Sequence, residues 1–250
     1  MSINRRNFLR KSTIAAGLPL VGCTQQVSNI EPLPFPKINK RDTILFQGDS
    51  ITDSFREKEK ELPNNTDSMG KGYAFLAASK LLKTLPGRDL TIYNRGISGN
   101  KVNQLSDRWE KDALDLKPDW ISILIGVNDY WHMLHHGYEG TFETYENGYR
   151  ELLKRTKDAL PDVKLIICQP FAIPGTTAVD ESWVEPFGKY QASAKKLALE
   201  FNAFWVPFQE AFDKAMLDAP ASYWIPDGVH PSISGSQLMA DEWLKIIQRT

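Results

Sequence analysis

The feature that most constrains the fold of this chain is an alternation of five short apolar runs with longer amphipathic stretches. The runs have strand-like composition and cover 43–47, 90–94, 120–125, 164–168 and 204–207. The stretches have helical periodicity and cover 72–84, 101–114, 142–159, 184–202 and 234–248. This alternation predicts a five-stranded parallel sheet with helices on both faces, which is a three-layer α/β/α sandwich.

Length and composition agree with one such domain. The chain has 250 residues, of which 42% are hydrophobic, so it can bury one sizeable core, and we expect a single domain over 43–250. The formal charge is −1, and the sequence has no basic stripe with interleaved aromatic residues. We therefore expect no nucleic-acid partner. The segments 53–70 and 170–183 are expected to be surface loops beside the functional edge of the sheet.

Polar segments follow three of the predicted strands. Gly48–Thr52 follows the first, Asn94–Asn100 the second and Gly126–Asp129 the third. Ligands of open α/β sheets bind at the carboxyl ends of the strands, so these segments should lie together at one site.

A fourth polar segment near the end of the chain supplies an acid and a base. Asp227 and His230 are three residues apart, and Ser50 lies in the first polar segment. A serine hydroxyl becomes a good nucleophile when an imidazole removes its proton, and a carboxylate can hold that imidazole in place. The alternative interpretation is that Gly-Asp-Ser and Asp-Gly are ordinary turn sequences, since these residues favour turns.

The four blocks in this order resemble the GDSL or SGNH hydrolase superfamily. The serine, glycine, asparagine and histidine of that name correspond to Ser50, Gly96, Asn128 and His230, and the similarity spans about 43–249. The resemblance implies a flavodoxin-like fold. Within the superfamily, Arg108-Trp109-Glu110 and the segment 125–131 resemble the branch of acetylxylan and related carbohydrate esterases.

The resemblance also implies roles for these residues. Ser50 would be the nucleophile, His230 the base and Asp227 its orienting carboxylate. The oxyanion hole would consist of the backbone N–H groups of Ser50 and Gly96 and the side-chain amide of Asn128. A glycine would let the backbone approach the substrate closely. The arrangement is not the Gly-x-Ser-x-Gly elbow of α/β-hydrolases, because the residue two after the nucleophile is threonine.

The expected substrate is an acetylated xylan or a similar acetylated glycan. Asp49, Tyr130, Trp131 and Trp224 are the candidate substrate contacts, and a shallow polar cleft walled by the three aromatic residues would favour acetate over longer acyl groups. One alternative is a thioesterase or lysophospholipase of the same superfamily. Another is a surface lipoprotein that binds glycans without catalysis, which would not need an oriented nucleophile and base.

The first 42 residues are expected to lie outside the fold. Residues 1–22 resemble a twin-arginine export signal that ends in a lipobox, so Cys23 would carry lipid and anchor an exported lipoprotein at the periplasm or cell surface. Residues 23–42 would form a proline-containing tether. The alternative is an ordinary signal peptide with an incidental cysteine. Membrane association is expected only through the lipid, and a homo-oligomer is left open.

No cofactor or metal is expected. His132, His135 and His136 are close in sequence, but no cysteine or glutamate at ligand spacing accompanies them, so we interpret them as loop or helix-surface residues that could line the cleft. Cys168 lies in an apolar strand and is expected to be a buried, inert thiol.

Overall fold

The computed structural model describes residues 38–248, and these contain the predicted parallel sheet. All paired strands are parallel, in the order β2-β1-β3-β4-β5. Their bounds are β1 Thr43–Gly48, β2 Thr91–Asn94, β3 Trp120–Leu124, β4 Lys164–Cys168 and β5 Phe204–Val206. Each predicted strand is therefore confirmed to within one residue at either end. The central β3 is buried along its whole length, as expected for a strand covered on both faces.

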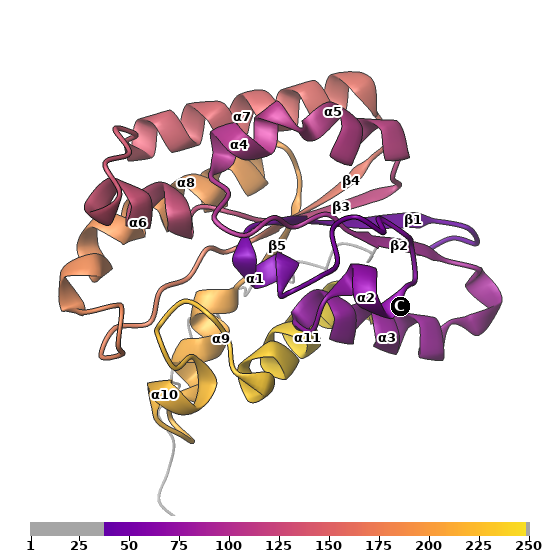
Figure 1. Ribbon diagram of the computed structural model, residues 1–250. Coiled ribbons are helices and arrows are strands. Elements are labelled where there is room, and N and C mark those ends of the chain that lie inside the picture. The colour runs from indigo at the N-terminus through magenta and orange to yellow at the C-terminus, as the bar shows by residue number, and fades with distance from the viewer. Residues whose placement is uncertain (1–37, 249–250) are drawn as a thin grey trace, which may run out of the picture. The chain divides into compact units, whose positions relative to one another are not determined.

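Helices cover both faces of the sheet, so the predicted three-layer sandwich is confirmed (Figure 1). On the upper face in Figure 1 lie α4 (Val102–Asp107), α5 (Trp109–Asp112), α6 (Val127–His135), α7 (Phe142–Ala159) and α8 (Val184–Glu200). On the lower face lie α2 (Thr66–Met69), α3 (Tyr73–Thr84), α9 (Phe208–Ala215), α10 (Ala221–Trp224) and α11 (Ile233–Gln248). The four-residue α1 (Ser50–Asp53) directly follows β1.

The helix predicted over 101–114 is broken in the structure. It consists of α4, α5 and the 3₁₀ turn Leu114–Leu116, and the first break is at Arg108, whose φ of −105° and ψ of 5° are not helical. Four further helices, α1, α6, α9 and α10, were not predicted. The loop predicted over 53–70 contains α2, and the loop predicted over 170–183 ends in the 3₁₀ turn Glu181–Trp183.

The domain begins before the predicted end of the tether. Ile38 is buried in the core, and the carboxylate of Asp42 accepts hydrogen bonds from the indole of Trp120 (2.9 Å) and from the N–H of Asn39 (2.8 Å). Residues 38–42 therefore belong to the domain. The predicted export signal and Cys23 lie outside the described residues. Within 38–248, no helix has the length and apolar character needed to cross a membrane.

Buried tryptophans satisfy their polar N–H groups inside the core. Trp109 donates to the hydroxyl of Thr156 and Trp243 to that of Ser122, each at 2.9 Å. These indoles are fully buried and serve packing, not sugar binding. The thiol of Cys168 is also buried, and burial raises its pKa to about 12, so it is inert as expected.

Candidate active site

Ser50 lies at the carboxyl end of β1, where it is the first residue of α1. The preceding Asp49 caps this helix, because its carboxylate accepts the N–H of Ile51 at 3.0 Å. Asp49 is only 1% exposed. It therefore lies beneath Ser50, and its candidate role as a substrate contact is not supported by the structure.

His230 reaches Ser50 from the loop between α10 and α11. Its Nε2 lies 2.8 Å from the hydroxyl oxygen of Ser50, and its Nδ1 lies 2.7 Å from a carboxylate oxygen of Asp227. These three side chains come from segments about 180 residues apart in the chain. The structure thus brings the three predicted residues into one hydrogen-bonded line, which is the geometry that activates a serine.

Asp227 is held by its own loop as well as by the imidazole. Its second carboxylate oxygen accepts the N–H groups of Val229 (2.9 Å) and His230 (2.7 Å). Burial opposes ionisation of this carboxyl, but the hydrogen bonds from His230 and Val229 outweigh it and lower the pKa of Asp227 to about 2. The hydrogen bond to Asp227 raises the pKa of His230 above its ordinary value of 6.5, against the opposite effect of burial.

Asn128 lies in the first turn of α6 and has one amide hydrogen to spare. Its Nδ2 donates to the carbonyl of Asn100 at 3.2 Å, and an amide nitrogen carries two hydrogens. The neighbouring Asp129 is fully buried and accepts the N–H of Val102 at 3.2 Å. Asp129 thus ties α6 to the start of α4.

The structure does not support Gly96 as an oxyanion donor. Its N–H already donates to the side-chain oxygen of Asn94 at 2.9 Å. A Cβ on this glycine would lie 2.4 Å from the backbone nitrogen of Asp53 and 2.9 Å from the carbonyl carbon of Thr52. Glycine is therefore required because this loop packs against α1, and not because substrate approaches it.

Gly99, three residues later, has the free N–H that this role requires. It donates to no residue among those the structure describes. Gly99 lies between Ser98, which lines a cavity with Ser50, and Asn100, which accepts the Asn128 amide. Its φ of +80° favours glycine, and a Cβ would meet only His132, at 3.9 Å. Sequence spacing alone could not separate two glycines in one short segment.

Two charged residues that the sequence analysis did not assign hold the loops of the site together. Arg108 donates to the carbonyls of Gly48 (3.3 Å) and Arg95 (2.8 Å) and to the side chain of Asn100 (2.8 Å). It thereby joins the end of β1 to the loop after β2. The break between α4 and α5 lies at this residue. The segment Arg108-Trp109-Glu110, which resembles the carbohydrate esterase branch, was the signal in the sequence that could have pointed to Arg108.

Asp53 is the second of these residues. Its side chain is 1% exposed and accepts the N–H (3.0 Å) and hydroxyl (2.5 Å) of Ser98, while Lys58 lies 2.9 Å away. Burial raises the pKa of Asp53, but the hydrogen bonds from Ser98 and Lys58 outweigh it, so the net shift is downward. An ionised Asp53 therefore fixes Ser98 beside Ser50.

A cavity of about 430 Å³ opens beside the serine and the imidazole. It falls within the usual range of small-molecule sites. Its lining combines hydroxyls, one ammonium group and apolar side chains, contributed by Ser50, Phe55, Lys58, Ser98, His230 and Ser236 among others.

The aromatic residues predicted to contact substrate are only partly placed there. The ring of Trp131 lies 6.3 Å from that of His230, so it does border the site. Tyr130 is 3% exposed and packs against Trp183 at 5.0 Å, inside an aromatic cluster. Trp224 donates to the carbonyl of Ala215 at 3.1 Å and does not line the cavity. A wall formed by all three aromatic residues was therefore the wrong expectation.

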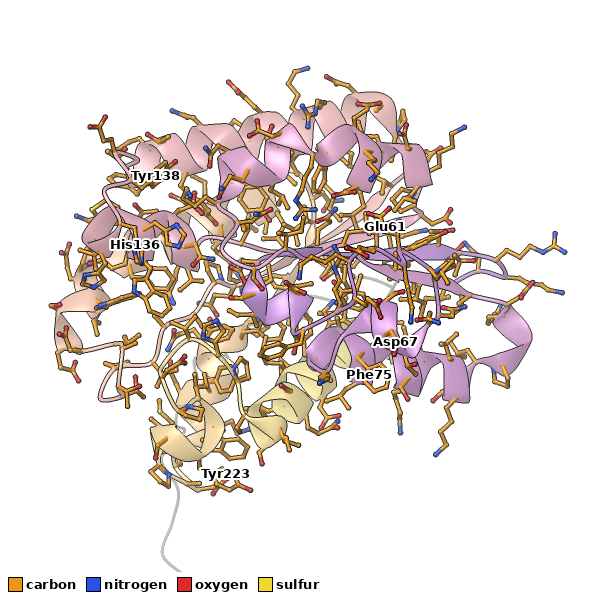
Figure 2. All side chains as sticks on the ribbon, viewed as in Figure 1. Glu61, Asp67, Phe75, His136, Tyr138 and Tyr223 are labelled. Atoms are coloured by element: carbon orange, nitrogen blue, oxygen red, sulfur yellow. The ribbon has the colours of Figure 1, made fainter. Side chains whose placement is uncertain are left out.

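The histidine-rich segment belongs to the end of α6 and the loop after it. His132 and His136 pack with their rings 5.0 Å apart, and His136 and Tyr138 lie toward the same end of the domain in Figure 2. The side-chain Nζ of Lys101 lies 3.3 Å from Nδ1 of His132. Burial and this cation lower the pKa of His132. Within residues 38–248, no three histidine, cysteine or acidic side chains are grouped as metal ligands would be.

Known proteins similar to this chain include esterases of one family. The curated acetylxylan esterase of Geobacillus stearothermophilus is 35% identical over 222 residues, which are 84% of this chain and 96% of that protein. Its crystal structure has a TM-score of 0.78 at 32% identity and covers 86% of this chain and 98% of that one. A structure from Parabacteroides merdae, described as a GDSL-like lipase, has a TM-score of 0.82 at 51% identity, with coverage of 84% and 98%.

Solved catalytic mutants of the Geobacillus enzyme replace a serine, an aspartate and a histidine by alanine. The family model of the GDSL-like lipase/acylhydrolase family matches residues 46–238 of this chain, from β1 into α11. With the fold and the coverage of these relatives, this match identifies the chain as a carboxylic ester hydrolase and a member of the GDSL-like lipase/acylhydrolase family.

Proposed function

We propose that this protein removes acetyl groups from an acetylated carbohydrate, such as acetylated xylan, by a Ser50–His230–Asp227 triad. The observation that carries this proposal is the continuous line of contacts from the Ser50 hydroxyl through the imidazole to the Asp227 carboxylate, at 2.8 and 2.7 Å. The similarity to an acetylxylan esterase supports the substrate class. In that enzyme the mutated catalytic aspartate and histidine are three residues apart, as Asp227 and His230 are here.

In the acylation step, the oxygen of Ser50 attacks the ester carbonyl carbon while its proton moves to Nε2 of His230. Asp227 holds the other ring nitrogen and stabilises the imidazolium that forms. The tetrahedral intermediate then collapses. The bond from carbon to the sugar oxygen breaks, the imidazolium returns its proton to that oxygen, and an acetyl group remains on Ser50.

The negative oxygen of the intermediate needs donors that are already in place. The N–H of Ser50, the N–H of Gly99 and the second amide hydrogen of Asn128 supply three. Each donor in such a hole contributes about 10²–10³ to turnover. Deacylation repeats the sequence with water, which loses its proton to His230 as it attacks the acetyl carbonyl. Ser50 is then reprotonated and acetate leaves.

The rival within the family is a thioesterase or lysophospholipase with a long acyl channel. The cavity presents Lys58, Ser98 and Ser236 close to the nucleophile. Such polar groups suit hydroxyl-bearing ligands, whereas an acyl channel would gain about 0.8 kcal/mol for each methylene buried in apolar surroundings. This contrast favours a short acyl group and a polar leaving group.

The test is hydrolysis of an ester panel by wild type and by Ser50→Ala. We expect acetate release from acetylated xylo-oligosaccharides, a decline of kcat/KM from 4-nitrophenyl acetate through butyrate to octanoate, and near-complete loss in Ser50→Ala with the fold intact by circular dichroism. A kcat/KM that rises with chain length would select the acyl-channel alternative. Equal rates for wild type and Ser50→Ala would refute the triad itself.

A further inference from the structure

Phe55 is an aromatic residue that the fold presents to solvent at the edge of the active-site cavity. The residue is 86% exposed, and it lines the same cavity as Ser50 and His230. Phenylalanine is among the residues most often buried, and this one contributes almost no core contact. Its position therefore calls for an explanation other than folding.

The backbone that carries this ring is in an uncommon conformation. Ser54 and Phe55 have φ values of +40° and +61°, in the left-handed region that bulky side chains rarely adopt. Two such residues directly follow the helix that bears the nucleophile. Unfavourable backbone conformations of this kind are concentrated at functional sites, where the surrounding structure maintains them.

The surrounding structure does maintain this one. The carbonyl of Ser54 accepts the N–H of Lys71 at 2.9 Å. Glycines flank that lysine because there is no room for side chains: a Cβ on Gly70 would lie 2.4 Å from the carbonyl oxygen of Asp53, and one on Gly72 would lie 2.8 Å from the Cβ of Ser54. The turn is therefore clamped on this side.

The residue after the ring is clamped as well. Arg56 is buried, and its side chain donates to the carbonyl of Gly96 at 2.7 Å, while its N–H donates to the carbonyl of Asp53 at 3.0 Å. The ammonium group of Lys71 lies over the Phe55 ring, 5.9 Å from its centre. Fixed neighbours thus hold an exposed ring beside the catalytic serine.

We propose that Phe55 is the stacking platform of a leaving-group subsite, which binds a pyranose ring of the glycan whose acetyl ester lies at Ser50. This proposal rests on the proposed function and adds where the sugar binds. An apolar face of the sugar would lie on the ring. Lys58 has ammonium hydrogens beyond the one directed at Asp53, and Ser98 and Ser236 line the same cavity, so hydroxyl groups of the sugar would find polar partners.

A long acyl chain is the competing ligand for an exposed phenylalanine. A sugar and an acyl chain require different side chains at position 55. A sugar face needs a flat ring, whereas an alkyl chain accepts any apolar side chain of similar size. The test compares Phe55→Trp, Phe55→Leu and Phe55→Ala with wild type. Leu217→Ala is the matched control, since Leu217 is 85% exposed and does not line the cavity.

The first measurement is kcat/KM for a fully acetylated methyl xyloside divided by kcat/KM for ethyl acetate, whose leaving group is too small to reach a platform. We expect this ratio to fall roughly tenfold in Phe55→Ala and in Phe55→Leu, mainly through KM, and to be retained in Phe55→Trp. Leu217→Ala should leave both activities unchanged. A ratio that survives in Phe55→Leu but falls in Phe55→Trp would indicate an alkyl site and overturn the proposal.

The second measurement is independent of catalysis. Binding of xylotetraose to Ser50→Ala, by calorimetry, should weaken about tenfold when Phe55→Ala is added. If wild type hydrolyses no acetylated sugar, the proposed function fails, and this binding measurement still decides whether Phe55 contacts a glycan. Equal xylotetraose affinity with and without the ring would refute the platform, whatever the enzyme hydrolyses.

Discussion

Gly96→Ala tests whether the glycine after β2 is needed for packing against α1 or for binding the oxyanion. The added Cβ would lie 2.4 Å from the backbone nitrogen of Asp53, which is three residues after Ser50 in α1. The atom it meets is backbone, so rotation of a side chain cannot relieve the contact. Either α1 or the loop 94–97 must move.

The size of the movement follows from the contact distance. An ordinary carbon contact begins at about 3.5 Å, so the two segments must separate by roughly 1 Å. Misplacing reacting groups by about 1 Å can cost on the order of 10² in rate. Overpacking of this kind also destabilises by about 1–3 kcal/mol, which corresponds to a fall in Tm of about 2–12 °C for a domain of this size.

The assay is thermal unfolding together with kcat for 4-nitrophenyl acetate. Gly188→Ala is the matched control, because it lies inside α8 and, apart from the adjacent backbone of that helix, no atom lies within 4 Å of the Cβ that it would add. Alanine in that helix should raise stability by about 0.5–1 kcal/mol and leave kcat unchanged. A Gly96→Ala protein with the Tm and kcat of wild type would show that the close approach of loop and helix is not required.

Four further predictions concern the same site and the chain that precedes it. His230 must be neutral to accept a proton and its pKa is raised, so kcat/KM should rise with pH, with the midpoint of the rise above 6.5. Asp227→Asn should lower both this midpoint and kcat. An unchanged midpoint would argue against the Asp227–His230 contact. The lowered pKa of Asp227 contributes stability that is present above about pH 4 and lost as pH falls toward 2, so the Tm of Asp227→Asn should fall less than that of wild type between pH 4 and pH 2. Asn128→Ala should lower kcat by about 10²–10³ with little change in KM, whereas a pure KM effect would assign Asn128 to ground-state binding. We also propose, from the sequence alone, that Cys23 carries a lipid anchor; Cys23→Ser should move the protein from the membrane to the soluble fraction, and wild-type protein without lipid mass would exclude the anchor.

The sheet and the edge that carries the site could be predicted because they depend on short-range patterns. Apolar runs of strand length followed by polar segments determine which residues lie at the carboxyl ends of β1, β2 and β3. The location of Ser50 and Asn128 at this edge follows directly from the ends of β1 and β3. The pairing of Asp227 with His230 is equally local, because both side chains lie in one short loop.

The parts that could not be predicted depend on which partner a group finds in three dimensions. The choice between Gly96 and Gly99 as the oxyanion donor depends on Asn94, because its side-chain oxygen already accepts the N–H of Gly96. The burial of Tyr130 depends on Trp183, more than 50 residues away, against which it packs. Neither relation leaves a periodic signal in the sequence.

The same argument explains why Phe55 was missed. From the sequence alone, a phenylalanine in a charged segment shortly after Ser50 predicts an apolar contact with the core. Its exposure depends on the clamps at Lys71 and Arg56, which force the turn into the left-handed region and turn the ring away from the core. A side chain that the fold keeps out of the core at some cost in backbone conformation is best explained by what it binds, and the cavity beside it is lined by Ser50 and His230.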